Sequence, residues 1–313
     1  MLDLKHDLIY YISGLTCIVT FSIIPLFSKY LTKSMDNITQ SYLVYMVRAV
    51  PFIIAVLINN YLTNDYFKLN YNLAEAFALD KIFLSTLESI RTVFIILAFI
   101  LLPSSIAQSL FFSYPIMILL LNHYMLNIPL TLHAVLGGLI GLIGVVVISY
   151  TTEKINGWVF IVGALMALTA AALEAYVTVY LKKEDIENDK SAYDIIPEMA
   201  NFLTFGTVLL TVLYLVYLTI FNKSIYFKPN FGTFPILSIS FISTITYFIG
   251  LIGIDPNIFA YIVPFSIVLL TIIFETLFEK KPMTVKNIVG ILFIIIGGVV
   301  SLISPAHPIN LTN

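Results

Sequence analysis

The chain has 313 residues, of which 59% are hydrophobic and only 11% charged, and its mean hydropathy is +0.98. One soluble core cannot absorb so much apolar surface, so the composition excludes a soluble globular domain. The net charge of −2 gives no basic surface for a nucleic-acid partner. We therefore expect a membrane protein.

Apolar stretches of roughly 20 residues have the length that one membrane-spanning helix needs. They are too long and continuous here for the alternating strands of a barrel. The predicted fold is all-α, a polytopic membrane protein with ten transmembrane helices. In chain order, the predicted spans are 8–31, 40–62, 81–101, 103–126, 130–151, 156–181, 196–221, 234–254, 256–279 and 284–304.

The second and third spans contain the only two arginines, Arg48 and Arg91. A charge inside a spanning helix is costly, so it usually faces a cavity or a partner and is a functional candidate. Glu88 precedes Arg91 by three positions, and residues at this spacing share a helix face. The pattern fits a self-neutralising structural pair. It also fits a site in which Arg48 or Arg91 binds an anionic group of a substrate while Glu88 tunes the arginine.

The fifth and tenth spans share one layout, PLTLHAVLGGLIGLIGV at 129–145 and PMTVKNIVGILFIIIGG at 282–298. Matching positions lie 153 residues apart, and the same offset relates spans three to five to spans eight to ten. Five spans make one unit, and because five is odd, a second unit enters the membrane from the opposite side. The sequence therefore predicts two inverted five-helix repeats, an architecture typical of secondary transporters with a site between the repeats.

Glycines seven residues apart in these two spans lie on nearly the same helix face. Such a face lets neighbouring backbones approach closely. We therefore expect the glycines to serve packing between helices rather than to line a pathway. They are Gly137, Gly141 and Gly144 in the first copy, and Gly290 and Gly297 in the second.

The sixth to ninth spans add further polar candidates. Glu174 lies inside span six, either as a carboxylate that binds a proton or cation or as a partner of Arg48 or Arg91. Glu275 is close to the end of its helix, where we expect an interfacial position near water. Coupling candidates are Glu174, Glu88 and Glu275, and the candidate substrate-binding residues are Arg48, Glu88, Arg91, Tyr114, Glu174, Asn201 and Tyr261.

Several motifs resemble the drug/metabolite transporter superfamily, in its EamA-type ten-helix branch. They are SKYL at 28–31, the in-span Arg48, the run RTVFIILAFILLPSSIAQSLFFSYP that Arg91 opens, and VPFSIVLL followed by FEKKPMT. Their order is similar to that in bacterial S-adenosylmethionine-transporter-like members. The resemblance implies two EamA-like five-helix repeats, 1–153 and 154–313. The acid that precedes the proline-threonine turn in the family is Glu279 in the second copy, whereas LNIPLT in the first copy has none.

These observations predict a secondary transporter that moves a small polar or amphiphilic metabolite by alternating access. The substrate class that the resemblance implies includes S-adenosylmethionine, an amino acid or a nucleotide-like compound. A multi-substrate drug or metabolite efflux pump is the main alternative. An integral membrane enzyme or a channel is less favoured, because the chain has no metal-ligand spacing of histidines, no phosphate-binding loop and no filter loop. No catalytic residue, metal or cofactor is predicted.

The expected location is the cell membrane, as a multi-pass protein, and the inner membrane if the source is bacterial. Expected partners are the small-molecule substrate, the lipid bilayer and a possible proton or counter-substrate, with no nucleic acid. The chain is expected to be a monomer or a homodimer. The resemblance implies that both termini are cytoplasmic.

Overall fold

The computed structural model describes residues 4–31, 36–62, 73–149, 156–188, 195–223, 233–254, 256–280 and 282–302. All regular secondary structure within these ranges is helical. The helices are α1 Leu4–Leu31, α2 Asn37–Leu62, α3 Leu73–Ala76, α4 Leu79–Leu101, α5 Ser104–Phe111, α6 Pro115–Leu126, α7 Leu132–Ser149, α8 Gly157–Asn188, α9 Ile195–Ile220, α10 Thr233–Gly253, α11 Pro256–Phe278 and α12 Val285–Leu302.

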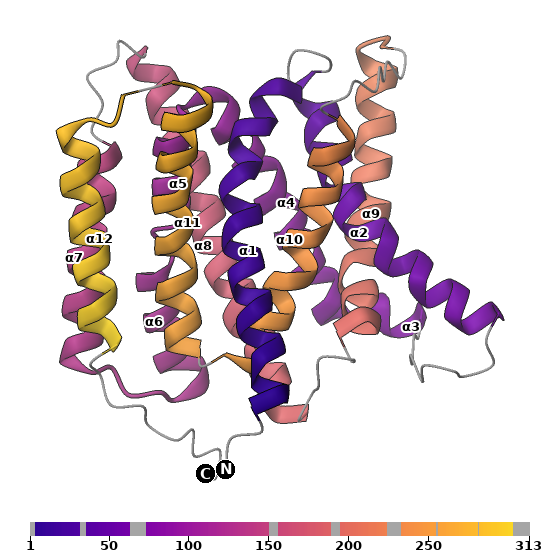
Figure 1. The fold of residues 1–313 in the computed structure, drawn as a ribbon. Helices are drawn as coiled ribbons and strands as arrows, with labels where there is room; N and C mark the ends of the chain where they lie inside the picture. The colour runs from indigo at the N-terminus through magenta and orange to yellow at the C-terminus, as the bar shows by residue number, and fades with distance from the viewer. Residues whose placement is uncertain are drawn as a thin grey trace.

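The helices confirm the all-α, polytopic prediction. Six helical segments of the described part are long and apolar enough to cross a membrane, and four shorter apolar helices accompany them. Figure 1 shows the helices standing side by side, with α1 beginning and α12 ending at the same side of the molecule. Together, the six long segments and the four shorter helices make ten apolar segments, which is the number that the sequence predicts.

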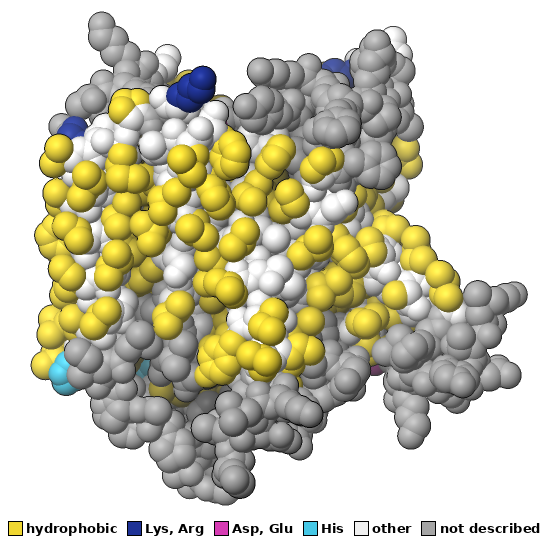
Figure 2. Space-filling model, in the orientation of Figure 1, with side chains coloured by type: hydrophobic (Ala, Val, Ile, Leu, Met, Phe, Trp, Pro, Cys, Tyr) yellow, Lys and Arg dark blue, Asp and Glu magenta, His cyan; other side chains and the backbone are white. Residues whose placement is uncertain are grey.

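The outer surface is apolar over the middle of the molecule. Figure 2 shows this face covered by hydrophobic side chains, with lysine or arginine at its upper edge and histidine at its lower edge. Val146, Leu213 and Leu292 are all more than half exposed. Contiguous apolar surface of this extent is unfavourable in water and favourable in lipid. The chain is therefore a multi-pass membrane protein.

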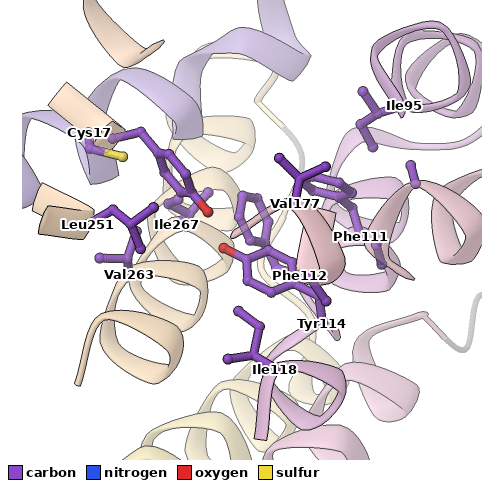
Figure 3. Close-up of a cluster of buried hydrophobic side chains, with 14 of the residues drawn as sticks. Cys17, Ile95, Phe111, Phe112, Tyr114, Ile118, Val177, Leu251, Val263 and Ile267 are labelled. Carbon is purple, nitrogen blue, oxygen red and sulfur yellow. The ribbon is translucent and has the colours of Figure 1, made fainter. Parts of the chain in front are cut away.

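The predicted span 103–126 is not one helix, because a turn at residues 112–114 divides it into α5 and α6. Pro115 occupies the first position of α6, where its missing N–H group costs no hydrogen bond. The Ser113 hydroxyl donates to the Leu110 carbonyl oxygen at 2.7 Å, which closes the last turn of α5. The break directs aromatic side chains toward the centre of the molecule, where Phe111, Phe112 and Tyr114 lie close to one another (Figure 3).

The packing interleaves the first and second halves of the chain. Helix α1 packs against α10 and α11, while α8 packs against α4, α5 and α6. Two further pairs join the halves, α2 with α9 and α7 with α12, and Figure 1 shows these pairs at opposite edges. Among the central helices, α1 therefore contacts α10 and α4 contacts α8 across the halves.

The glycines of α7 and α12 pack against each other's backbone, as the sequence predicts. A Cβ atom on Gly144 would lie 2.5 Å from the carbonyl oxygen of Gly290. A Cβ atom on Gly297 would lie 2.5 Å from the carbonyl oxygen of Gly137. Since real Cβ contacts are longer, only glycine permits this approach.

Candidate functional site

Helix α4 presents a carboxylate and a guanidinium one turn apart. Arg91 Nε donates to Glu88 Oε2 at 2.7 Å, and Arg91 Nη2 also contacts Glu88 Oε1. Both side chains are buried. Two parallel contacts of this kind make a bidentate pair, which is strong and directional. The self-neutralising pair that the spacing predicts is therefore present.

Glu174 of α8 joins the same arginine from the other half of the chain. Its Oε2 atom lies 3.0 Å from Arg91 Nε. The sequence leaves open whether Glu174 binds a proton or cation or pairs with Arg48 or Arg91. In the structure it forms an ion pair with Arg91. Arg91 thus holds one carboxylate from its own helix and one from α8.

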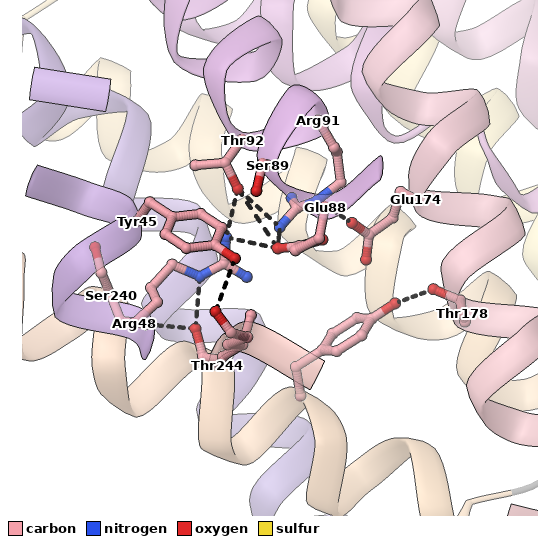
Figure 4. A network of polar contacts seen from close by, with 12 residues as sticks. Tyr45, Arg48, Glu88, Ser89, Arg91, Thr92, Glu174, Thr178, Ser240 and Thr244 are labelled. Atoms are coloured by element: carbon pink, nitrogen blue, oxygen red, sulfur yellow. Dashed lines mark hydrogen bonds and ion pairs between the residues drawn. The ribbon is translucent and has the colours of Figure 1, made fainter. Parts of the chain in front are cut away.

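Arg48 of α2 approaches Glu88 from the opposite direction (Figure 4). Its Nη1 atom lies 3.2 Å from Glu88 Oε1 and donates to Thr92 Oγ1 at 3.2 Å. Its Nε atom donates to Thr244 Oγ1 of α10 at 2.7 Å. Arg48 therefore connects α2, α4 and α10.

We call Arg48, Glu88, Arg91 and Glu174 the charge cluster. Two positive and two negative groups give it a formal charge of zero, which suits a site shielded from water. A buried charge is tolerated when it is paired and hydrogen-bonded, while removing one partner strands the other. The cluster is contributed by helices of both halves, at the crossing of α2, α4 and α8.

A small cavity lies beside the two arginines. Its open volume is about 30 Å³, and its walls come from α1, α2, α4, α5 and α10. The polar side chains that line it are Arg48, Arg91, Thr92, Gln108 and Ser240. The aromatic side chains that line it are Phe21, Phe99, Phe111 and Phe112.

The other predicted residues form no ion pair with the charge cluster in the described part of the structure. Tyr114 is buried and packs its ring against Phe111 and Phe112. No hydrogen bond or ion pair connects Asn201 of α9 to the charge cluster in the described residues, although Asn201 is buried. The side chain of Tyr261 lies outside the described part of the structure.

Glu275 differs from its expected interfacial placement near water. It is close to the end of α11, as the sequence indicates, but its side chain is only 5% exposed. Packing against neighbouring helices covers it, so it does not extend into water.

Sequence reasoning missed several uncharged residues around the cluster, namely Thr92, Gln108, Ser240 and Thr244. A signal existed for Thr244, because the 153-residue offset aligns it with Arg91. Thr92 directly follows Arg91 in the sequence. Nothing in the sequence distinguishes Gln108 or Ser240 from the many other polar residues of the spans. Within the described ranges, no group of three or more metal-binding side chains is present.

Comparison with known proteins finds a family similarity over part of the chain. Residues 8–150 match the EamA-like transporter family, which confirms the EamA-type resemblance over these residues. A crystal structure of a protein with 15% sequence identity has the same fold, with a TM-score of 0.67 over 94% of this chain and 97% of that chain. No curated protein sequence matches the chain.

Proposed function

We propose that this multi-pass membrane protein, whose residues 8–150 match the EamA-like transporter family, is a secondary transporter. It moves a small polar or amphiphilic metabolite by alternating access. Candidate substrates are S-adenosylmethionine, an amino acid and a nucleotide-like compound. Residues 1–153 and 154–313 are the two proposed inverted five-helix repeats.

The packing pattern supports the two-repeat organisation. In the proposed repeats, α1 corresponds to α8, α4 to α10, and α5 with α6 to α11. The contacts of α1 with α10 and α11 then correspond to those of α8 with α4, α5 and α6. The pairs α2 with α9 and α7 with α12 exchange with themselves. Repeats related in this way place their shared site at the interface between them.

The charge cluster is the observation that carries the proposed site. It joins α2 and α4 of the first repeat to α8 of the second, beside a cavity. A buried ionisable group in a membrane span is usually part of a substrate or ion pathway. An anionic group of the substrate would bind here by competing with Glu88 or Glu174 for an arginine.

This competition also gives a route to coupling. A guanidinium that exchanges Glu174 for a substrate carboxylate leaves Glu174 without its cation. A carboxylate that loses a nearby positive charge in a buried site binds a proton more readily. Substrate binding and proton binding are then linked through Arg91.

Purified protein in proteoliposomes tests the proposal directly. Radiolabelled S-adenosylmethionine, amino acids, nucleotides and a lipophilic cation are supplied with and without a proton gradient. Accumulation of at least one metabolite above protein-free liposomes is expected. Accumulation of the lipophilic cation alone would favour the efflux pump, and no accumulation of any compound would overturn secondary transport of this substrate class.

Glu88→Gln and Glu174→Gln test the coupling role. Each variant is expected to lose gradient-driven accumulation while it retains exchange of substrate across the membrane. Glu275→Gln is measured beside them, because Glu275 is the third coupling candidate and lies on α11 outside the charge cluster. Unchanged accumulation in both cluster variants would exclude them as the coupling carboxylates.

A further inference from the structure

Helices α1 and α10 meet closely on the side of the molecule at which α1 begins, which we call the terminal side (Figure 1). A Cβ atom on Gly250 would lie 3.5 Å from the Gly14 Cα atom. A Cβ atom on Gly253 would collide with the ring of Tyr10. The last turn of α10 therefore lies directly against the first half of α1.

Two lysines join further helix ends on the terminal side. Lys182 of α8 is buried, and its Nζ atom donates to the Leu251 carbonyl oxygen in the last turn of α10 at 2.9 Å. A cation is favourable there because the carbonyl groups at a helix end carry partial negative charge. Lys81 at the start of α4 is also buried, and its Nζ atom donates to the two carboxylate oxygens of Glu184 at 2.8 and 2.7 Å. These contacts connect α4, α8 and α10.

The cavity lies on the other side of the charge cluster. Along α4, the residues that line it run from Arg91 to Phe99, toward the end of the helix, whereas Lys81 lies at its start. Along α1, the lining residues are Phe21 and Ile24, in the second half of the helix. The open space beside the cluster is therefore on the side opposite the terminal side, which is closed by packing and by the two lysines.

The ion pair on the terminal side has no counterpart in the other repeat. The 153-residue offset aligns Lys81 with Phe234. The first and sixth spans match at an offset of 149 residues, which aligns Glu184 with Met35. Only Lys182 has an equivalent lysine in the sequence, Lys33. The ion pair therefore distinguishes the two sides of a molecule whose halves are otherwise alike in layout.

We propose that Lys81, Lys182 and Glu184 form a gate that closes the terminal side of the charge cluster. Opening this side breaks the ion pair and the lysine contact while α1 separates from α10. Because the ion pair occurs on one side only, it favours the conformation that is closed there over the conformation that is open there. This inference rests on the proposed alternating access and specifies which contacts hold one of its two states.

The only cysteine of the chain reports on this gate. Cys17 is 0% exposed and lies in the buried apolar cluster (Figure 3). It follows Gly14 by three positions, and residues at this spacing share a helix face. Cys17 therefore lies on the face of α1 that meets α10, and separation of these helices exposes its thiol.

The test measures how fast a membrane-impermeant methanethiosulfonate reagent labels Cys17 of the full-length chain in membrane vesicles. Vesicles of both orientations are used, and a protease-cleavable tag at the N-terminus identifies the side that faces outward. Lys81→Met, Lys182→Met and Glu184→Gln are each expected to be labelled at least about fivefold faster than the parent from the terminal side. Labelling from the opposite side should not rise.

Three further variants serve as controls. Lys223→Met removes a cation whose Nζ atom lies 3.9 Å from Asp36 Oδ2 on the opposite side, where α2 begins, and should leave terminal-side labelling at the parent rate. Lys81→Glu combined with Glu184→Lys restores the ion pair in reverse and should return the rate toward that of the parent. Cys17→Ser gives the background of the reagent.

The outcomes separate a gate from a loss of stability and from the proposed function. Equal increases from both sides would indicate general loosening and overturn the gate, as would unchanged labelling of Lys81→Met and Glu184→Gln. If Lys81→Met does not reach the membrane, the near-isosteric Glu184→Gln decides the question. Accumulation in proteoliposomes with unchanged labelling would remove the gate and leave transport standing. Opening on the terminal side without accumulation of any compound would support the gate and count against transport.

Discussion

Glu174 Oε2 of α8 lies 3.0 Å from Arg91 Nε of α4, so an ion pair buried within the membrane span joins the two halves of the chain. Because Arg91 also holds Glu88, one guanidinium neutralises a carboxylate from each half. The arrangement makes the stability of the molecule and the availability of its candidate site depend on the same groups.

Removing Arg91 is expected to destabilise the protein strongly. Arg91→Met leaves the buried Glu88 and the partly buried Glu174 with Arg48 as the remaining cation of the cluster. Breaking a buried pair in this way costs roughly 3–5 kcal/mol. The free energy of unfolding in detergent, measured by denaturant titration, checks the loss. The double variant Arg91→Met with Glu174→Gln should recover part of it, whereas simple addition of the two single effects would contradict the pairing.

Replacement of both arginines by lysine tests what their shape contributes. Arg48→Lys and Arg91→Lys keep the charge but lose the planar fork. We expect both variants to reach the membrane. Arg48→Lys should bind a carboxylate substrate more weakly, with a smaller penalty for its amide. If both variants bind the acid and the amide as the parent does, the arginines are structural only.

The glycine contact between α7 and α12 is expected to be intolerant of a single methyl group. In Gly297→Ala the new Cβ atom would lie 2.5 Å from both the Gly137 carbonyl oxygen and the Gly141 amide nitrogen. Backbone atoms cannot move aside, so the loss should be about 1–3 kcal/mol. Gly157→Ala is the control, since nothing lies within 4 Å of a Cβ atom there. Equal melting temperatures for the two variants would refute the close packing.

A second, partly buried ion pair joins the start of α4 to the end of α8. Lys81 Nζ lies 2.8 Å and 2.7 Å from the two carboxylate oxygens of Glu184. Lys81→Met should lower the melting temperature by leaving Glu184 without this cation. The charge-swapped variant Lys81→Glu with Glu184→Lys should restore most of the loss. A swapped variant no more stable than Lys81→Met would argue against an electrostatic role.

The N-terminal cap of α2 is expected to make stability depend on pH. Asp36 Oδ1 accepts from the backbone nitrogens of Ile38 and Thr39, each at 3.1 Å. Partial burial raises the pKa of Asp36, but hydrogen bonds from Thr39 and Tyr217 and the charge of Lys223 outweigh it, so the pKa lies below its ordinary value.

A depressed carboxyl pKa contributes stability that is present above the ordinary value, about 3.9, and is lost as the pH falls through the depressed value. Asp36→Asn retains the cap but removes the charge. The melting temperature of the parent should therefore exceed that of Asp36→Asn at pH 7, and the difference should shrink in acid. A difference independent of pH would mean that the charge of Asp36 is not responsible.

The sequence predicts the helices well because lipid enforces a simple rule of length and polarity. It does not predict the break between α5 and α6, although Pro115 after Tyr114 is a helix-start signal. Hydropathy is high on both sides of this turn, so a window of about 20 residues averages over it. The short α3 lies outside any apolar run.

The charged part of the site is predictable for the same reason. Arg48, Glu88, Arg91 and Glu174 stand out because charges in a span must find partners, and the structure brings all of them together. Gln108 and Ser240 do not stand out, since neutral polar side chains are common in spanning helices and their partners depend on the tertiary arrangement. The 153-residue offset aligns Thr244 with Arg91, and Thr244 accepts a hydrogen bond from Arg48. A position equivalent to a charged residue in the other repeat can therefore indicate a polar residue of the site.

The contact of α7 with α12 has a mechanical consequence. Backbone meets backbone through Gly144 with Gly290 and through Gly137 with Gly297, so no layer of side chains lies between these points to deform. Sliding would drive the next bulky side chains into the opposing helix, and we therefore expect the two helices to move as one rigid body. The last helices of the two halves, α7 and α12, are then held together along one edge of the molecule. We expect relative motion of the halves to be a rotation about this edge, with the largest displacement near α2 and α9, which pack against each other at the opposite edge (Figure 1).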